Sequence, residues 1–524
     1  MFFFWSVLPI IWVVVSMSVF NLPAKKVLPI GLLLTSIISI LVWKNSIFEV
    51  LVIWLVGTLK AIEILLIIFG AIWLLQILLK TKQIQVIQLS LSNIHKDARV
   101  QLLIVGYAFS NFLEGIAGFG TPAAIVAPLL VSLGFTPIFT VIISLIFNST
   151  AVTFGASGTP MLATLGLVEP IDKHWLLQNS VLIHFLVGIL VPIVGMIVYL
   201  KLLRKVSGWR AVFQIMPFTL LSAIVFLVTY SVSAIFLGVE IPSIVGGLVT
   251  ILVLVLLAKN NWLTPKDILL AENLETVAKE QKLVSKKEFL KAWFPYLLIS
   301  LILIITRVRS FGIRDFLSNI KIVIPDFLEV QNLTYNITPL MIPGLLPFLP
   351  VCIFCLWFFK AKLENTKHTL RETWKKLVPA IITLCSALAL VELLRFDSNS
   401  NSDMSSMIRV MSDGIVTLAG DNFIFISPLI GALGAFLTGS STVSNLLFTS
   451  LQLEINNMLN YERPVLVVGQ IVGSAFGNMF AISNILAAMA TVGISEGEGK
   501  ILRYLVIVSL SFLTLITLTL FFIR

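Results

Sequence analysis

Four polar stretches interrupt otherwise apolar sequence, and they hold most of the side chains that could bind a small solute. They are residues 114–122 (EGIAGFGTP), 148–160 (NSTAVTFGASGTP), 438–445 (TGSSTVSN) and 473–484 (GSAFGNMFAISN). Each combines glycine or proline, which break or kink a helix, with hydroxyl, amide or carboxyl side chains. A broken helix at membrane depth leaves unpaired backbone groups, so it is tolerated only where protein or water covers it. Its free N–H groups attract anions, and its free carbonyl groups attract cations.

One such stretch alone would fit close helix packing through small residues. Four stretches, two in each half of the chain, instead favour a substrate-binding site on which they converge near the middle of the bilayer. The expected site residues are Gly118, Gly120, Thr121, Pro122, Asn148, Ser149, Thr150, Ser157, Gly158, Thr159, Gly439, Ser440, Ser441, Thr442, Ser444, Asn445, Asn478, Ser483 and Asn484. We expect no metal ion and no cofactor among them.

Ionisable residues inside the apolar regions are the candidates for ion coupling, because a charge in hydrocarbon is costly and by default functional. Glu114 opens the first polar stretch. Burial disfavours its ionised form, which suits a group that accepts and releases a proton. The alternative is a carboxylate that caps backbone N–H groups. Glu240 precedes Pro242 at the start of an apolar run, where proton coupling competes with the ordinary role of a first-turn acid.

Other ionisable residues in these regions have a structural interpretation. Lys60 and Glu63 lie three residues apart on one expected helix face, and so do Glu392 and Arg395. Each pair is predicted to satisfy its own charges. His184 lies inside an apolar run, where we expect it to pack or to form a hydrogen bond rather than to relay protons.

The composition predicts the environment of these residues. Of the 524 residues, 58% are apolar and 12% are charged, whereas a soluble protein carries about a quarter charged residues. Apolar runs of about 20 residues match a hydrocarbon layer of about 30 Å. The apolar runs that could form spans are 2–20, 27–43, 47–79, 100–113, 124–147, 176–200, 211–230, 241–258, 292–308, 339–359, 377–395, 422–438, 464–476 and 500–523. The sequence therefore predicts an all-α polytopic membrane protein with about 12–14 spans, forming one transporter domain over residues 1–524. Residues 2–20 are expected to form the first span, because a signal peptide has the reverse charge polarity.

The basic residues predict the orientation of the chain. Its formal charge is +10, and the lysines gather in short loops between spans, a pattern of membrane orientation rather than of nucleic-acid binding. The loops 259–291 and 360–376 hold seven lysines and six Lys/Arg residues, against three Lys/Arg in 309–338 and one in 396–413. We therefore expect 259–291 and 360–376 in the cytoplasm, together with 80–99 and 201–210.

The spacing of the polar stretches indicates an internal repeat. In each half, one break (115–122 or 438–445) is followed by a second (148–160 or 473–484). Paired breaks at corresponding positions are typical of transporters with inverted repeats. We expect two inverted repeats with broken or re-entrant helical segments, the first over 47–258 and the second over 292–524, joined by a cytoplasmic connector at 259–291.

Several of these motifs occur together in one known family. The run 113–135 (LEGIAGFGTPAAIVAPLLVSLGF) and the A-V-x-F-G-A-x-G-x-P pattern within 148–160 are accompanied by LGVEIPSIVGG at 237–247, AWFPY at 292–296 and EGEGKIL at 496–502. Together they resemble the lactate permease family, in family order, from about residue 50 to the C-terminus. The resemblance implies a bacterial inner-membrane secondary transporter that carries lactate, and in some members glycolate, with protons. It also implies an inverted-repeat architecture.

The second half departs from the pattern of this family. A typical member reads T-G-S-D-T where this chain has Thr438–Thr442, so Ser441 replaces an acid. A typical member also reads G-K-M-I-S-P-Q where this chain has Gly477–Ser483, so Asn478 replaces a lysine. Removing one partner of a buried ion pair costs about 3–5 kcal/mol, whereas removing both can be neutral. The joint loss is coherent if the two were partners, and it leaves the identity of the carboxylate open.

We therefore expect a secondary active transporter that takes up a small monocarboxylate, lactate or a similar 2-hydroxy acid, by proton symport across the inner (plasma) membrane. The alternatives are a carrier of a different organic anion with another coupling ion, such as sodium, and a channel. An enzyme is not expected, since the sequence has no H-E-x-x-H zinc motif and no P-loop. The expected partners are the carboxylate, the coupling ion and the lipid bilayer, with no nucleic acid. The oligomeric state is left open.

Overall fold

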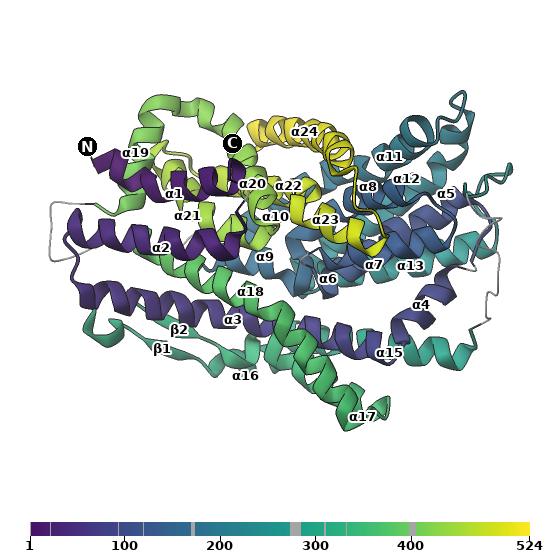
Figure 1. Ribbon diagram of the computed structural model, residues 1–524, viewed down its shortest axis with the longest axis horizontal. Coiled ribbons are helices and arrows are strands. Elements are labelled where there is room, and N and C mark those ends of the chain that lie inside the picture. Colours follow the sequence, from purple (N-terminus) through teal and green to yellow (C-terminus); the bar gives the residue numbers. More distant parts are fainter. Residues whose placement is uncertain are drawn as a thin grey trace.

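Helices that run roughly along the long axis of the molecule form nearly all of the protein (Figure 1). The computed structural model describes residues 2–20, 22–92, 94–118, 120–168, 173–272, 284–308, 311–331, 333–397 and 405–524. The central part of the predicted connector, 273–283, lies outside the described residues.

The elements are named here in chain order, with short 3₁₀ or π-helical turns labelled η. The first half contains α1 (Phe2–Ser18), α2 (Ala24–Leu41), α3 (Ile47–Lys80), α4 (Gln83–Ser92), α5 (Ala98–Gln101), η1 (Leu102–Phe109), α6 (Ser110–Ile116), α7 (Thr121–Ser132), α8 (Pro137–Asn148), η2 (Ser149–Phe154), α9 (Gly155–Leu165), α10 (Lys173–Gly188), α11 (Leu190–Ile197), η3 (Val198–Leu203), α12 (Arg210–Val232), η4 (Ser233–Leu237) and α13 (Pro242–Lys259). The second half contains α15 (Lys286–Arg307), α16 (Ile313–Asn319), β1 (Ile322–Ile324), η6 (Phe327–Glu329), β2 (Tyr335–Ile337), η7 (Pro339–Met341), η8 (Gly344–Phe348), α17 (Leu349–Phe358), α18 (Leu363–Arg395), α19 (Met407–Ala419), η9 (Gly420–Asn422), α20 (Phe423–Thr438), α21 (Ser441–Met458), α22 (Val465–Gly477), η10 (Asn478–Phe480), α23 (Ile482–Thr491) and α24 (Glu498–Ile523).

The predicted fold class is confirmed. Among the described residues, 11 helical segments are long and apolar enough to cross a membrane, and Phe2–Ser18, Thr121–Ser132 and Gly344–Phe358 are shorter apolar helices. The only strands in the described part of the chain are β1 and β2, which pair antiparallel with Ile322 opposite Ile337. The chain is therefore an all-α, multi-pass membrane protein.

The order of helices in the two halves is similar around the polar breaks. In the first half, α6 and α7 flank one break, and α8, η2 and α9 form the next; in the second half, α20 and α21 correspond to the first pair, and α22, η10 and α23 to the second group. This order is what an internal repeat would produce. The inverted relation of the halves and the boundaries 47–258 and 292–524 stay predictions.

Some predicted spans were wrong in their boundaries. Residues 124–147 read as one apolar run, but the chain turns at Gly134, whose φ is +92°, and Pro137 starts a second helix, so the run is divided between α7 and α8. The polar-looking segment 441–458 was not predicted as a span, yet it forms the almost wholly buried helix α21. Most of the predicted loop 360–376 is the first part of α18, since that helix begins at Leu363. Hydropathy missed α21 because protein, rather than lipid, surrounds most of this helix.

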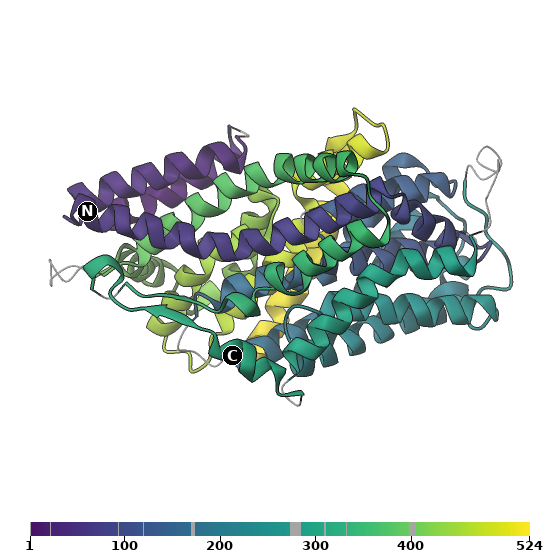
Figure 2. The same cartoon turned by 90° about the horizontal axis from the view of Figure 1, so that it is seen from below.

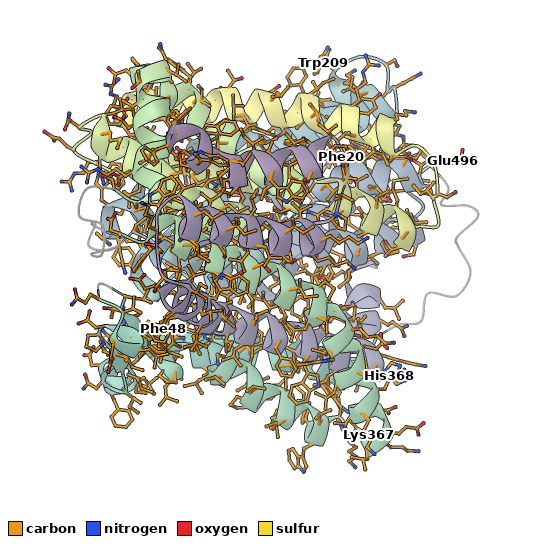
Figure 3. All side chains as sticks on the ribbon, turned by 60° about the vertical axis from the view of Figure 1, so that its left-hand side comes forward. Phe20, Phe48, Trp209, Lys367, His368 and Glu496 are labelled. Carbon is orange, nitrogen blue, oxygen red and sulfur yellow. The ribbon has the colours of Figure 1, made fainter. Side chains whose placement is uncertain are left out.

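The ends of the molecule differ in their loops. Lys367 and His368, which belong to the basic segment 360–376, lie at the lower right in Figure 3, whereas Phe48 at the start of α3 lies at the left. In Figure 1, β1 and β2 lie toward the left and α4 toward the right. The described parts of the basic segments and the two strands therefore lie toward different ends of the molecule. The assignment of the basic end to the cytoplasm stays a prediction.

Helices α3 and α18 pack closely against each other, as the purple and green helices in the middle of Figure 2 show. Their crossing is close because Gly57 has no side chain: a Cβ there would lie 2.5 Å from the Cα of Ala389. Lys60 and Glu392 lie three residues beyond Gly57 and Ala389, on the adjacent turns. The glycine therefore brings a cation of one helix against an acid of the other.

Candidate functional site

The four polar stretches meet around one small cavity, called here the central cavity. Its lining comes from all four stretches and consists of Glu114, Gly118, Val152, Gly155, Ala156, Thr159, Pro160, Gly439, Ser440, Ser441, Thr442 and Asn478. The cavity volume is about 20 Å³, which is room for about one water molecule. The structure is thus a closed conformation, in which these segments touch one another.

The first break separates α6 from α7. Helix α6 ends at Ile116, and the chain then passes through Gly118 and Gly120, whose φ angles are +55° and +73°. Glycine suits both positions because a side chain is disfavoured at such angles. Helix α7 starts from Gly120 with Thr121 and Pro122 in its first turn. Gly118 packs against Ala156, so the first break contacts the second.

The second break follows α8 as the 3₁₀ turn η2 and continues into a left-handed bend. Ala156, Ser157 and Gly158 have φ angles of +43°, +51° and +78°. Two consecutive non-glycine residues in this region store strain, which structures retain mostly at functional sites. Gly158 permits a close approach, because a Cβ there would collide with the carbonyl oxygen of Val239, next to Glu240.

The third break ends α20 and begins α21. Gly439 has a φ of +70° and lies against Ser483 of the fourth stretch. Ser440 caps α21, accepting a hydrogen bond from the N–H of Val443 at 3.3 Å. The first turn of this 18-residue helix, with Ser441 and Thr442, therefore reaches the central cavity. A helix N-terminus carries partial positive charge and attracts anions.

The fourth break lies between α22 and α23. The side-chain amide of Asn484 donates to both the backbone and the side-chain oxygen of Asn478, at 3.1 and 2.9 Å. These bonds hold Asn478 at the central cavity. Ser441 and Asn478, the two positions at which the resemblance implied an acid and a lysine, thus line the same cavity. That such an acid and lysine would be partners stays a prediction.

Glu114 is the one ionisable residue that lines the central cavity within the described part of the chain. Its side chain is buried, and Asn148 Nδ2 donates to its Oε2 at 2.8 Å. Its Oε1 lies so close to Gly155 that a Cβ at that position would collide with it. No ion pair joins Glu114 to another described residue. The glycine and the asparagine therefore define the position of a carboxyl group that has no cation beside it.

Hydrogen bonds connect the two halves of the site. Thr442 Oγ1 donates to Thr159 Oγ1 at 3.4 Å, and Asn445 Nδ2 donates to the carbonyl oxygen of Pro160 at 3.1 Å. Both bonds join α21 to α9. They tie the third break to the second across the boundary between the predicted repeats.

The predicted residues divide into a lining group and a supporting group. Gly118, Thr159, Gly439, Ser440, Ser441, Thr442 and Asn478 line the central cavity. The supporting group does not line it and consists of Gly120, Thr121, Pro122, Asn148, Ser149, Thr150, Ser157, Gly158, Ser444, Asn445, Ser483 and Asn484. The assignment of either group to substrate binding stays a prediction.

Sequence reasoning missed several neighbours of these residues. Gly155, Ala156 and Pro160 lie inside a predicted stretch and line the cavity, although they were not singled out. Gln470 Nε2 donates to Asn445 Oδ1 at 3.3 Å, and the hydroxyl groups of Ser441 and Ser474 lie 2.5 Å apart. A polar residue in the apolar run 464–476 was the signal that could have pointed to Gln470.

Glu240 lies outside the central cavity, in a buried ion pair. Arg307 Nε donates to Glu240 Oε1 at 2.7 Å, and the same guanidinium donates to the carbonyl oxygen of Met341 at 2.6 Å. This pair joins the start of α13 to the end of α15 and to η7. The geometry is that of a structural clamp, while a coupling role for Glu240 stays a prediction.

Lys60 forms its ion pair with Glu392 rather than with the predicted partner Glu63, although the charge of Lys60 still acts on the Glu63 carboxyl group. Lys60 Nζ bonds Glu392 Oε1 at 2.8 Å, across the crossing of α3 and α18, and Glu63 bonds Tyr335 of β2. The predicted pair of Glu392 and Arg395 is present at 3.9 Å, so the carboxylate of Glu392 lies between two cations. A partner on a neighbouring helix cannot be read from spacing along one helix, which is why the first pair was misassigned.

His184 forms a hydrogen bond and packs, as predicted. Its Nε2 lies 2.7 Å from Thr153 Oγ1, and its ring stacks on Phe476. Its Nδ1 has no hydrogen-bond partner among the described residues. His184 therefore braces η2 through Thr153, and neither residue lines the central cavity.

No enzyme-like site is apparent in the described ranges. They contain no group of three or more His, Cys, Asp or Glu residues that could hold a metal ion. Residues 493–497 (GISEG) match the G-x-S-x-G spacing of a nucleophile elbow, but such an elbow joins a strand to a helix. Here the segment is the link between α23 and α24, and Ser495 is exposed.

Comparison with known proteins gives a consistent result. The sequence profile of a family described as L-lactate permease matches residues 3–524. The L-lactate permease of Salmonella typhimurium (strain LT2) is 30% identical over 469 residues, which are 85% of this chain and 82% of that protein. The L-lactate permease of Bacillus subtilis is 29% identical, covering 87% and 84%. The glycolate permease GlcA of Escherichia coli (strain K12) is 28% identical over 98% and 93% of the two chains.

Among solved structures, the YdaH transporter of Alcanivorax borkumensis is similar over 88% of this chain and 84% of its own, with 11% identity and a TM-score of 0.42. A similarity this low carries no weight for fold or function.

Proposed function

This protein belongs to the L-lactate permease family, and we propose that it takes up lactate or a similar 2-hydroxy acid by symport with a proton. Membership makes it a transporter rather than an enzyme, embedded as a multi-pass protein in the bacterial plasma membrane. It also leaves the channel alternative without support. The substrate within the family and the coupling ion are the parts that we propose.

The observation that carries the proposal is the position of Glu114 in the central cavity. Glu114 is the ionisable residue of that lining among the described residues, and it is buried. The hydrogen bond that its carboxyl group accepts from a described residue comes from an uncharged amide. A carboxylate buried without a cation is costly, so a proton that neutralises it stabilises the closed conformation. A proton and a substrate that bind and leave together would satisfy this requirement in each transport cycle.

The substrate carboxylate has suitable donors opposite Glu114. The first turn of α21 offers backbone N–H groups and the helix dipole, and the hydroxyl groups of Ser441, Thr442 and Thr159 line the same wall. Hydroxyl groups can donate to a carboxylate or accept from the 2-hydroxyl group of the substrate. This combination suits a small hydroxy acid.

Binding requires the central cavity to widen, since it now has room for about one water molecule. The glycines at positive φ in three of the breaks provide flexible points at which the helices on either side could move. The hydrogen bonds from Thr442 to Thr159 and from Asn445 to Pro160 join the segments that must separate. We propose that opening breaks these two bonds.

A second candidate is a carrier of another organic anion, coupled to a different ion. The specific observation is that Ser441 and Asn478 make the cavity neutral at the positions where typical family members place charges. A changed lining of this kind could bind a changed substrate. Sodium, held by carbonyl groups of the broken helices, is the alternative coupling ion.

Uptake into proteoliposomes tests these proposals. We expect labelled L-lactate to enter against its gradient when the outside is more acidic, and unlabelled glycolate to compete with it. Replacing external sodium by choline should leave uptake unchanged. Uptake that needs sodium rather than a pH gradient would overturn proton symport, and competition only by unrelated organic anions would favour the second candidate.

A further inference from the structure

A larger cavity lies beside the central cavity and contains a lysine. We call it the Lys60 cavity. Its volume is about 270 Å³, and its walls come from α3, α9, the β2–η7 segment, α18 and α21. The residues used below are Lys60, Glu63, Leu162, Asn336, Leu388 and Leu446, all of which line it. A volume of this size accommodates a small carboxylate.

The two cavities share the walls formed by α9 and α21. On α9, Pro160 lines the central cavity and Leu162 lines the Lys60 cavity. On α21, Thr442 lines the first and Leu446, one turn later, lines the second. The hydrogen bond from Asn445 to Pro160 joins the two helices between these positions. A solute that leaves the Lys60 cavity by parting α9 from α21 therefore enters the central cavity.

The Lys60 cavity supplies the cation that the central cavity lacks. The ammonium of Lys60 can donate three hydrogen bonds, and its bond among the described residues goes to Glu392 Oε1 at 2.8 Å. The side chain of Lys60 is 27% exposed, whereas that of Glu392 is 8% exposed. A carboxylate already bonds this ammonium, so another carboxylate can bond it with the same geometry. Arg395, 3.9 Å from Glu392, remains to neutralise Glu392 if Lys60 turns to another partner.

The other residues of the cavity favour a monocarboxylate. Glu63 faces the cavity three residues after Lys60, where a second substrate carboxylate would be repelled by it. Tyr335 of β2 holds Glu63 through a hydrogen bond. Leu162, Leu388 and Leu446 provide apolar walls for a methyl or methylene group. One available cation, one acid and an apolar wall match a short-chain anion with a single carboxylate.

We propose that the Lys60 cavity is an outer binding station for the transported monocarboxylate, where the ammonium of Lys60 binds the substrate carboxylate in place of Glu392 before transfer to the central cavity. This inference rests on the proposed function, since it assumes a monocarboxylate substrate. Asn336 of β2 lines the cavity, and β2 lies toward the end of the molecule opposite the basic segments (Figure 1). With the orientation predicted from the basic loops, this is the side reached from outside the cell.

Transport kinetics of three variants test the role of Lys60. Lys60→Met with Glu392→Met removes both charges, which avoids an unpaired buried carboxylate. Loss of a charge-assisted hydrogen bond to the substrate should then raise the KM for external lactate about ten-fold or more. Lys60→Arg should keep the KM near that of the wild type. Glu392→Gln should lower the KM, because Lys60 loses its internal competitor. A merely structural pair predicts the opposite for Glu392→Gln, which would then only weaken the protein.

Protection from labelling tests the location independently. In a chain without its three native cysteines, Asn336→Cys should react with a membrane-impermeant maleimide added outside, and lactate should slow the reaction. Asn319→Cys, exposed on α16 and outside the cavity, should react equally fast with and without lactate. Protection at position 336 should disappear in the Lys60→Met, Glu392→Met background.

The outcomes separate this inference from the proposed function. If the wild type transports lactate but the double variant keeps its KM and position 336 is never protected, the Lys60 station is refuted while the transporter stands. If the wild type transports no monocarboxylate, the proposed function fails first.

Discussion

Substitution of Glu114 by glutamine separates proton coupling from substrate movement. The amide has the size of a protonated carboxyl group, so packing against Gly155 should be kept. Its carbonyl oxygen can still accept the hydrogen bond that Asn148 Nδ2 donates to Glu114 at 2.8 Å. The substitution therefore removes the titratable proton and little else.

The expected loss of substrate accumulation follows from the free energy of the proton gradient. A difference of one pH unit is worth about 1.36 kcal/mol per proton, so coupling to one proton concentrates the substrate about ten-fold. If Glu114 carries that proton, the glutamine variant should reach a concentration ratio of about one under the same gradient. Exchange of labelled for unlabelled lactate should persist, because exchange needs no net proton movement.

The assay compares gradient-driven accumulation with exchange in proteoliposomes made from the same protein preparation. Glu454→Gln is the matched control, because Glu454 is paired loosely with Arg409 at 3.8 Å on the surface, and it should behave as the wild type. No backbone N–H among the described residues bonds the Glu114 side chain, so the structural alternative is a carboxylate that accepts from Asn148 Nδ2. In that case the glutamine weakens a charge-assisted hydrogen bond worth about 1.5–3 kcal/mol, and both activities should fall together. Full accumulation by the glutamine variant would refute the proton role and direct attention to Glu240.

Three further perturbations test the surrounding structure. Gly155→Ala places a Cβ against Glu114 Oε1, and because overpacking costs about 1–3 kcal/mol, lactate uptake should fall about ten-fold. The control Gly499→Ala, which has open space around it, should not alter uptake. Normal uptake by Gly155→Ala would contradict the close packing of Gly155 against Glu114. Arg307→Met leaves the buried Glu240 unpaired and should lower the free energy of unfolding by about 3–5 kcal/mol, whereas the double variant Glu240→Met, Arg307→Met should lower it much less. Thermal unfolding in detergent measures the difference, and equal stability of the single and double variants would argue against the structural clamp. Lys367→Cys should react with an impermeant maleimide only after cells are permeabilised, and labelling in intact cells would reverse the assigned orientation.

Much of the architecture could be predicted from local sequence. Apolar runs near the length of a bilayer span identified most of the membrane helices, since hydrocarbon demands both apolar side chains and internally paired backbone. Helix α3 (47–80) followed the run 47–79 closely. The same reasoning failed for α21, because its polar side chains contact other helices, and hydropathy reports only the cost of contact with lipid.

The sequence by itself also determined which residues could form a site. Polar, helix-breaking stretches in an apolar chain have unpaired backbone groups that must be shielded from lipid. Four such stretches must therefore contact one another, other parts of the protein or water. Glu114 was identifiable because an ionisable residue inside a membrane-spanning region is costly and is by default a functional candidate.

Only the tertiary structure decided how these residues are paired. Lys60 was expected to pair with Glu63 along one helix, yet it pairs with Glu392, because Gly57 lets α18 approach α3 at that level. Glu240 likewise finds Arg307, 67 residues away in the chain. Ion pairs form between the groups that packing brings within reach in a dry interior, and that distance depends on how whole helices cross rather than on spacing within any one of them. For the same reason, the separation of the carboxyl group of Glu114 and the ammonium of Lys60 into two neighbouring cavities is visible only in three dimensions.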